Sequence, residues 1–345
     1  MDENDILLNN NIMEKSIIDK KAEAKSHNNR GVLLHMEGDM KGALSEYRRA
    51  LEIDPLNSTA LNNMGFLLAQ EGKFKEAIDY YQKAIDIEPH KSMAFANMGN
   101  ACAAIGDFPG GIEYLNRAVE LDPKNTMAWD NLGKLLMATG RLSEAESAWR
   151  SALLITPTES HLLTSLGTVV GARERLSEAV DILQRAVHFD ENSAQAWAQL
   201  GIVLFMRQDL GSSLDALMHA KELSPDDTSI RHHLALTFIA KGDEISAQAE
   251  LQSILAIEPE NQKVQIDLAV LYLSSGQFEE SLTLIDEVLK KDKGNQKALF
   301  YKAVTFVQLG KKNEGRNILQ ELSGSNGKYA KQALDLLNNM EPETQ

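Results

Sequence analysis

The sequence contains little cysteine and few aromatic residues. Cys102 is the only cysteine among 345 residues, which excludes a disulfide within the chain and suits a reducing compartment. Aromatic residues make up only 6% of a chain that is 43% apolar. With many alanines and leucines, this composition favours closely packed helices over a β-sandwich.

The sequence also lacks an excess of positive charge and any long apolar run. Its 35 lysines and arginines face 50 acidic residues, giving a net charge of −15, which disfavours a nucleic-acid partner or an anionic membrane surface. No stretch approaches the ~18 apolar residues of a membrane-spanning helix. Asp2, Glu3 and Asp5 stand where a signal peptide would be cationic. We therefore expect a cytoplasmic protein without membrane insertion.

What the sequence does have is a repeat with a period of 34 residues. A small residue recurs at this interval in nine copies, at Gly31, Gly65, Gly99, Gly133, Gly167, Gly201, Ala235, Ala269 and Ala303. In the second copy, a further small residue, Ala77, follows twelve positions later, and a bulky one, Tyr81, follows sixteen later. Nine such copies without insertion or deletion indicate a repeat array.

Each copy predicts two helices joined by a turn. Leu61, Met64, Gly65 and Leu68 form one apolar helical stripe. Glycine marks the turn after the first helix, except in the fifth and sixth copies, where Glu174 and Gln208 make the turn geometry harder to predict. We expect the first helices of several copies to be capped by Asn57, Ser92, Asn125, Ser193 and Asn261.

With this spacing the chain resembles the tetratricopeptide repeat (TPR) family over about residues 24–328. The resemblance implies an all-α fold, a right-handed superhelical α-solenoid of nine helix pairs whose first helices line a concave surface. The apolar positions in residues 329–340 predict a capping helix, which a solenoid needs at its end. Residues 341–345 are expected to form a flexible tail, and residues 1–23 a lead-in that is partly helical or disordered.

An asparagine stands two residues before the small residue in each of the first four copies. These four residues, called here the asparagine ladder, are Asn29, Asn63, Asn97 and Asn131. At ~100° per residue, Asn63 points ~150° away from the apolar stripe, so the helix core does not require it. The array resembles the TPR region of the O-GlcNAc transferase family, where asparagines at this position line the concave groove and hold peptide. We expect no counterpart of that family's catalytic domain.

An asparagine amide can bond both the C=O and the N–H of an extended peptide. Helices ~10 Å apart and a rise of ~3.3 Å per residue would let one ladder amide meet about every third peptide residue. The position before the ladder varies (Asn28, Asn62, Ala96, Asp130), whereas the ladder position stays asparagine in these four copies. This contrast favours a function for the ladder itself. Asparagines merely inherited by repeat duplication stay open as an alternative, since later copies carry Ser165, Gln199, His233, Asp267 and Tyr301.

Further residues on the same face complete the predicted peptide-binding set. They are Asn62, Phe66, Met93, Asn100, Met127 and Lys134. Methionines adapt to varied apolar side chains, and Phe66 offers a place for one anchor. Ordinary half-buried packing is the alternative reading of each.

We find no catalytic or metal-binding pattern among the eight histidines and Cys102. The stretch GDFPGG (106–111) lacks the Lys-Ser/Thr of a phosphate loop and predicts a helix–helix turn. The sequence therefore predicts a scaffold or adaptor without catalytic activity, cofactor or metal, which binds an extended protein segment. Two alternatives stay open: a self-assembling homo-oligomer in which the apolar positions of residues 6–18 dock into the next copy, and an accessory subunit of a separate enzyme such as a transferase.

Overall fold

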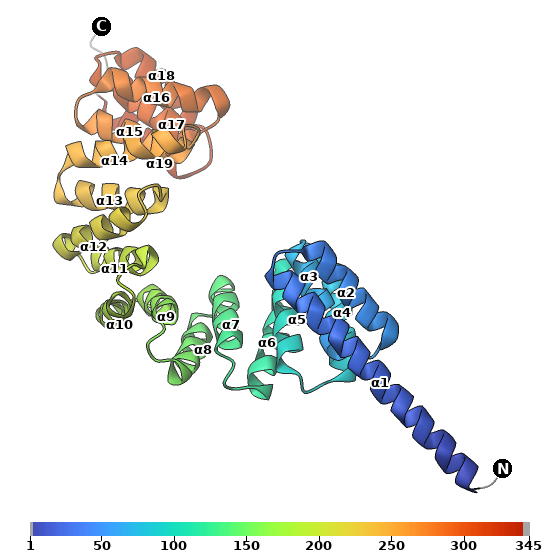
Figure 1. Ribbon diagram of the computed structural model, residues 1–345. Coiled ribbons are helices and arrows are strands. Elements are labelled where there is room, and N and C mark those ends of the chain that lie inside the picture. The colour runs from blue at the N-terminus through green and yellow to red at the C-terminus, as the bar shows by residue number, and fades with distance from the viewer. Residues whose placement is uncertain (1–2, 341–345) are drawn as a thin grey trace. The chain divides into compact units, whose positions relative to one another are not determined.

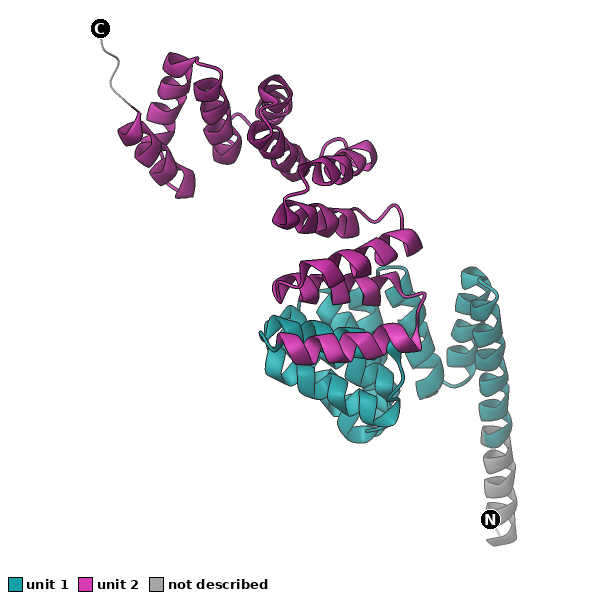
Figure 2. Ribbon diagram, turned by 90° about the vertical axis from the view of Figure 1, so that its left-hand side faces the viewer, with its two compact units in different colours: residues 1–175 teal, residues 176–345 magenta. Residues whose placement is uncertain are grey.

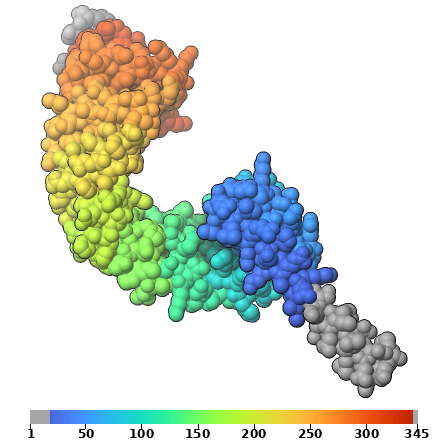
Figure 3. All heavy atoms as spheres, viewed as in Figure 1, coloured from blue at the N-terminus to red at the C-terminus, as the bar shows by residue number. Residues whose placement is uncertain are grey.

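The described part of the chain is entirely helical. The computed structural model describes residues 3–340, with side chains from residue 18 onward. Figure 3 draws in grey the residues outside the range 18–340. Within the described range the chain forms nineteen α-helices and no β-strand, which confirms the predicted all-α fold. None of these helices is long and apolar enough to cross a membrane.

The helices divide into two compact units, residues 1–175 and residues 176–345 (Figure 2). Unit 1 contains α1 (Glu3–Met36), α2 (Met40–Ile53), α3 (Ser58–Gln70), α4 (Phe74–Ile87), α5 (Ser92–Ala104), α6 (Phe108–Leu121), α7 (Thr126–Ala138), α8 (Leu142–Ile155) and α9 (Ser160–Ala172). Unit 2 contains α10 (Leu176–Phe189), α11 (Ala194–Met206), α12 (Leu210–Leu223), α13 (Thr228–Lys241), α14 (Glu244–Ile257), α15 (Gln262–Ser274), α16 (Phe278–Lys291), α17 (Gln296–Gln308), α18 (Lys312–Ser323) and α19 (Lys328–Asn339).

Unit 1 is a stack of helix pairs (Figure 1). Each odd-numbered helix from α1 to α7 packs against the even-numbered helix that follows it, and each pair packs against the next. The odd-numbered helices α1, α3, α5, α7 and α9 also contact one another in succession, so they form one continuous layer. This layer carries the asparagine ladder.

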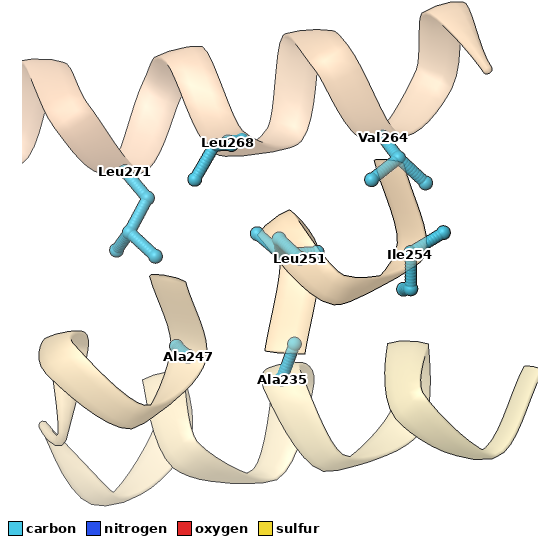
Figure 4. Close-up of a cluster of buried hydrophobic side chains, with 7 residues drawn as sticks. All are labelled: Ala235, Ala247, Leu251, Ile254, Val264, Leu268 and Leu271. Carbon is cyan, nitrogen blue, oxygen red and sulfur yellow. The ribbon is translucent and has the colours of Figure 1, made fainter. Parts of the chain in front are cut away.

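Unit 2 repeats the same arrangement with the pairs α11–α12 to α17–α18. Figure 4 shows how one pair meets the next: Ala235 of α13 and Ala247 of α14 face larger side chains from α14 and α15, namely Leu251, Ile254, Val264, Leu268 and Leu271. The last helix, α19, packs against α17 and α18 and buries Ala333 beside Leu319 and Leu322. It therefore covers apolar surface at the position where the sequence predicts a cap.

The predicted pairing of small and bulky residues sets how closely the helices of a pair approach. A Cβ atom added at Gly65 would lie only 2.7 Å from Cε1 of Tyr81, and one at Gly133 would lie 2.6 Å from Cε2 of Trp149. Both aromatic side chains are only 1% exposed. The aromatic ring of the second helix thus fills the space that a side chain on the glycine would occupy. The two helices are packed as densely as molecules in an organic crystal.

All nine turns inside the pairs share one backbone conformation. Seven have a left-handed glycine, such as Gly72 with φ of 78°. Glu174 and Gln208, with φ of 63° and 65°, adopt the same conformation without being glycine. The turn geometry is therefore preserved in the two copies where the sequence made it hard to predict.

The structure corrects one predicted helix start and extends the first helix. Asn57, Asn125 and Ser193 cap their helices as expected, but Ser92 does not: Lys91 is the N-cap of α5, and the Ser92 hydroxyl donates to the Ala118 carbonyl at 3.0 Å. Helix α1 runs from Glu3 through the expected boundary at residue 24. The apolar side chains predicted to dock, up to residue 17, and the tail 341–345 lie outside the described residues.

Candidate functional site

Three of the four ladder asparagines lie at equivalent places on neighbouring helices of unit 1. Asn63, Asn97 and Asn131 are half-buried on α3, α5 and α7, and Asn29 is exposed on α1. Helices α3, α5 and α7 begin 34 residues apart and contact one another in succession, so Asn63, Asn97 and Asn131 each lie one helix further along the same layer.

Two of the ladder amides are held by the helix before them. Nδ2 of Asn63 donates to Oδ1 of Asn28 at 2.9 Å, and Nδ2 of Asn97 donates to Oδ1 of Asn62 at 3.0 Å. Both acceptor side chains are buried, at 4% and 3% exposure. A planar amide that donates from Nδ2 in this way cannot turn over without placing two oxygens together. The bond therefore fixes the orientation of each ladder amide.

This pairing adds a role for the position before the ladder. Asn62 was predicted only as a peptide-binding residue, yet Asn28 and Asn62 are the acceptors that orient the next ladder residue. At the third step Ala96 offers no acceptor, and no hydrogen bond joins the Asn131 amide to another residue in the described range. At the fourth step Oδ1 of Asp130 accepts instead from Nε1 of Trp149 at 2.8 Å.

One cavity of about 650 Å³ in unit 1 brings eight of the ten predicted site residues together. These are Asn62, Asn63, Phe66, Met93, Asn97, Asn100, Met127 and Asn131. The lining also includes Val32, His35 and Met36 of α1, which are not among the residues predicted from the sequence. Val32 holds the same repeat position as Phe66, and His35 and Met36 lie one helical turn further along, so helical phase could have found all three.

The other two predicted residues do not line this cavity. Asn29 lines a separate cavity of about 520 Å³ together with Lys21 and Lys25. Lys134 lines a third, of about 380 Å³, together with Met127 and Asn131, and its ammonium pairs with the buried carboxylate of Asp130 at 2.7 Å. The structure therefore separates Asn29 from the predicted set, whereas Lys134 lies beside two of its members.

The main cavity is lined mainly by apolar side chains and asparagine amides, with the imidazole of His35 among them. Its methionines are well exposed, with Met36 at 81%, Met127 at 75% and Met93 at 59%. Beside them the Phe66 ring lies 5.7 Å from the ring of His35, whose Nε2 is 2.7 Å from Oε1 of Gln70. The lining contains no aspartate, glutamate, lysine or arginine. Polar contacts to a ligand must come mainly from the amides.

The ladder position of α15 in unit 2 carries a charged group instead of an amide. Asp267 holds the ladder position of α15, where its carboxylate lies 3.4 Å from Nε2 of His232 and 2.7 Å from Nζ of Lys297. Burial alone would raise the pKa of Asp267, but the hydrogen bonds from His232 and Lys297 outweigh it and hold this pKa below its ordinary value. These side chains satisfy one another, whereas the amides of unit 1 keep free bonding capacity.

The described residues contain no group of three or more His, Cys, Asp or Glu that could hold a metal. Cys102 is a free, buried thiol, and burial raises its pKa above the ordinary value. In GDFPGG, Gly106 is the left-handed turn residue and Asp107 caps α6 by accepting from the Gly110 N–H at 3.0 Å. The stretch is therefore a helix–helix turn, as predicted.

Comparison with known proteins points to one repeat family. Residues 8–231, more than half of the chain, match the family described as the cilia and flagella-associated protein 70 C-terminal domain. Residues 238–293 and 266–322 match two families described as tetratricopeptide repeat. No curated protein matches the sequence.

Solved structures show the same fold. The crystal structure of the APC/C hetero-tetramer Cut9–Hcn1 is 17% identical with a TM-score of 0.57, covering 79% of this chain and 55% of that one. A structure from the functional characterisation of Pseudomonas aeruginosa PilF is 16% identical with a TM-score of 0.54, covering 60% and 94%. At these identities the likeness concerns the fold alone.

Proposed function

The chain belongs to the tetratricopeptide repeat family of the cilia and flagella-associated protein 70 C-terminal domain, and we propose that this interaction scaffold binds an extended segment of a partner protein in unit 1. The observation that carries the proposal is the cavity of about 650 Å³ in which three ladder amides meet exposed apolar side chains. It supports binding rather than catalysis, because amides and methionines recognise a peptide but supply no general acid, base or nucleophile.

The free bonding capacity of the amides suits a peptide backbone. In Asn63 and Asn97 one N–H is committed to the preceding helix, which leaves Oδ1 without a partner in the described part of the chain. A carbonyl oxygen held in this way accepts from a backbone N–H of the ligand. The ladder residues lie on helices roughly 10 Å apart, so they match an extended segment at about every third residue.

The binding energy follows from the number of contacts. Each amide contact contributes roughly 0.5–1.5 kcal/mol net, so three contacts give a useful but not a tight interaction. Apolar burial in the cavity has to supply the rest. We place this binding in the cytoplasm, where the single free thiol of Cys102 stays reduced.

The test is affinity capture from the source cell with wild type and a variant that changes only unpaired amides. Asn100→Ala with Asn131→Ala fits this need, because neither side chain bonds another described residue. The matched control is Asn116→Ala, an exposed asparagine on the second helix of the third pair. We expect a partner that wild type and the control retain and the double variant loses. Equal capture by all three proteins would refute the proposed site.

A further inference from the structure

We propose that the partner segment carries a large, uncharged apolar side chain that enters the unit 1 cavity, so that the site selects an apolar anchor and rejects a charged one. This inference rests on the proposed function and names the class of ligand that the site takes.

The first observation is the absence of charge from the lining. Charged residues make up 25% of the chain, yet none of the fifteen residues that line the cavity is Asp, Glu, Lys or Arg. The nearest charges along the layer are Lys134 and Asp130. They line an adjoining cavity that shares Met127 and Asn131 with this one, and they pair with each other at 2.7 Å. A charged ligand side chain would therefore lose hydration on entry and find no carboxylate, ammonium or guanidinium group in the lining to pair with.

The second observation is the concentration of exposed apolar side chains on this one cavity. Met36, Phe66, Met93 and Met127 come from four successive helices of the layer, and each is at least 42% exposed. Single exposed apolar residues are ordinary, but a cluster that surrounds a hollow marks a binding surface. Methionine is unbranched and polarisable, so three of them can adapt to anchors of different shape.

The third observation is the combination of room and amides, which points to a polypeptide as the occupant. A volume of about 650 Å³ lies within the roughly 300–1,000 Å³ of sites that enclose a drug-sized ligand, so one or two large side chains fit. Asn63, Asn97 and Asn131 line the same hollow and offer backbone contacts on three helices. An apolar side chain flanked by backbone amides is the chemistry that this arrangement matches.

The experiment selects ligands from a library of random 12-residue peptides displayed on phage, with the full chain as bait. Synthetic copies of the enriched peptides are then measured by fluorescence anisotropy, along with a peptide of residues 1–22 of this chain. The protein variants are Met93→Glu with Met127→Glu, the amide variant Asn100→Ala with Asn131→Ala, and the control Leu154→Glu. Leu154 is 87% exposed on α8 and does not line the cavity, so its change tests the added charge alone.

We expect enriched peptides that share one Phe, Trp, Leu, Ile or Met. Replacing that anchor by Ala should weaken binding about 10- to 100-fold, as expected for the loss of a buried apolar side chain. The methionine variant should lose binding to a similar extent, and Leu154→Glu should keep it. Circular dichroism checks that each variant remains helical.

Three outcomes would overturn the inference. The apolar anchor is refuted if the enriched peptides share a charged residue, or if they bind the methionine variant with the same affinity as wild type. In either case the amide variant still tests whether the peptide binds in the unit 1 cavity. If the amide variant also binds normally, or no peptide is enriched, the proposed function itself fails. Tighter binding of the 1–22 peptide than of any selected one would make a second copy of this chain the occupant.

Discussion

The bond between the ladder and the helix before it predicts unequal effects of the same substitution at two ladder positions. In Asn97→Ala the buried Oδ1 of Asn62, in a side chain only 3% exposed, loses its donor. An orphaned buried acceptor costs about 1–3 kcal/mol. In Asn131→Ala no described residue loses a partner.

Helix propensity acts alike in both variants, because alanine favours a helix over asparagine by up to about 0.7 kcal/mol. Asn131→Ala should thus be neutral or slightly stabilising. Asn97→Ala should be about 1–3 kcal/mol less stable than Asn131→Ala, which corresponds to a difference in Tm of roughly 2–4 °C per kcal/mol for a unit of this size.

Thermal unfolding followed by circular dichroism, on the two variants side by side, measures this difference. The double variant Asn62→Ala with Asn97→Ala completes a mutant cycle and should recover much of the loss, since it removes the acceptor together with its donor. If Asn97→Ala and Asn131→Ala melt at the same temperature, the interhelix bond contributes nothing and the reasoning is wrong. If the bond holds, replacing Asn63, Asn97 and Asn131 together by alanine would change stability as well as binding, so that variant could not test binding alone.

Three further predictions concern the fold. Gly65→Ala should destabilise unit 1 by about 1–3 kcal/mol, seen as a lower Tm, because the new Cβ would lie 2.7 Å from the Tyr81 ring; an unchanged Tm would show that the ring moves aside freely. In Gly72→Ala the new Cβ meets no atom within 4 Å, but the residue must keep φ near 78°, so the free energy of unfolding should fall by only about 1 kcal/mol. A larger fall in urea unfolding would mean that the turn has other contacts. Asp267→Asn should cost about 1 kcal/mol at pH 7. Folding lowers the pKa of Asp267, so this stabilisation is fully present above the ordinary value of 3.8 and is lost as the pH falls through the lower folded-state pKa. The gap between wild type and variant should therefore narrow in melts at successively lower pH below 3.8, and a gap that does not narrow would contradict the ion pair.

The fold could be predicted because its main determinants are local. The 34-residue period places a small residue opposite a bulky one, and Gly65 with Tyr81 shows that the contact leaves no room for a side chain. The turn conformation follows from helix termination, which is strong enough to hold Glu174 and Gln208 left-handed. The N-cap of α5 was mispredicted because Ser92 aligns with Ser58, the first residue of α3, and not with its cap Asn57. The 34-residue repeat itself gives this alignment, so the sequence could have shown it.

The candidate site was predicted in part. Helical phase alone placed eight of ten residues around one cavity, since the first helices keep the same rotation from copy to copy. What the sequence did not reveal is the bond from Asn63 to Asn28, which joins residues 35 positions apart on neighbouring helices. The varied position before the ladder hid this bond, because only two of its four residues, Asn28 and Asn62, accept from a ladder amide.

The most direct test of the central claim is nuclear magnetic resonance on the full chain with 13C-labelled methionine methyl groups. A partner peptide is added, and the methyl signal of each of the twelve methionines is followed. The account predicts shifts for Met93 and Met127, which line the cavity, and none for Met206, which is 45% exposed on α11 of unit 2. A shift at Met206 with none at Met93 and Met127 would show that the partner binds elsewhere.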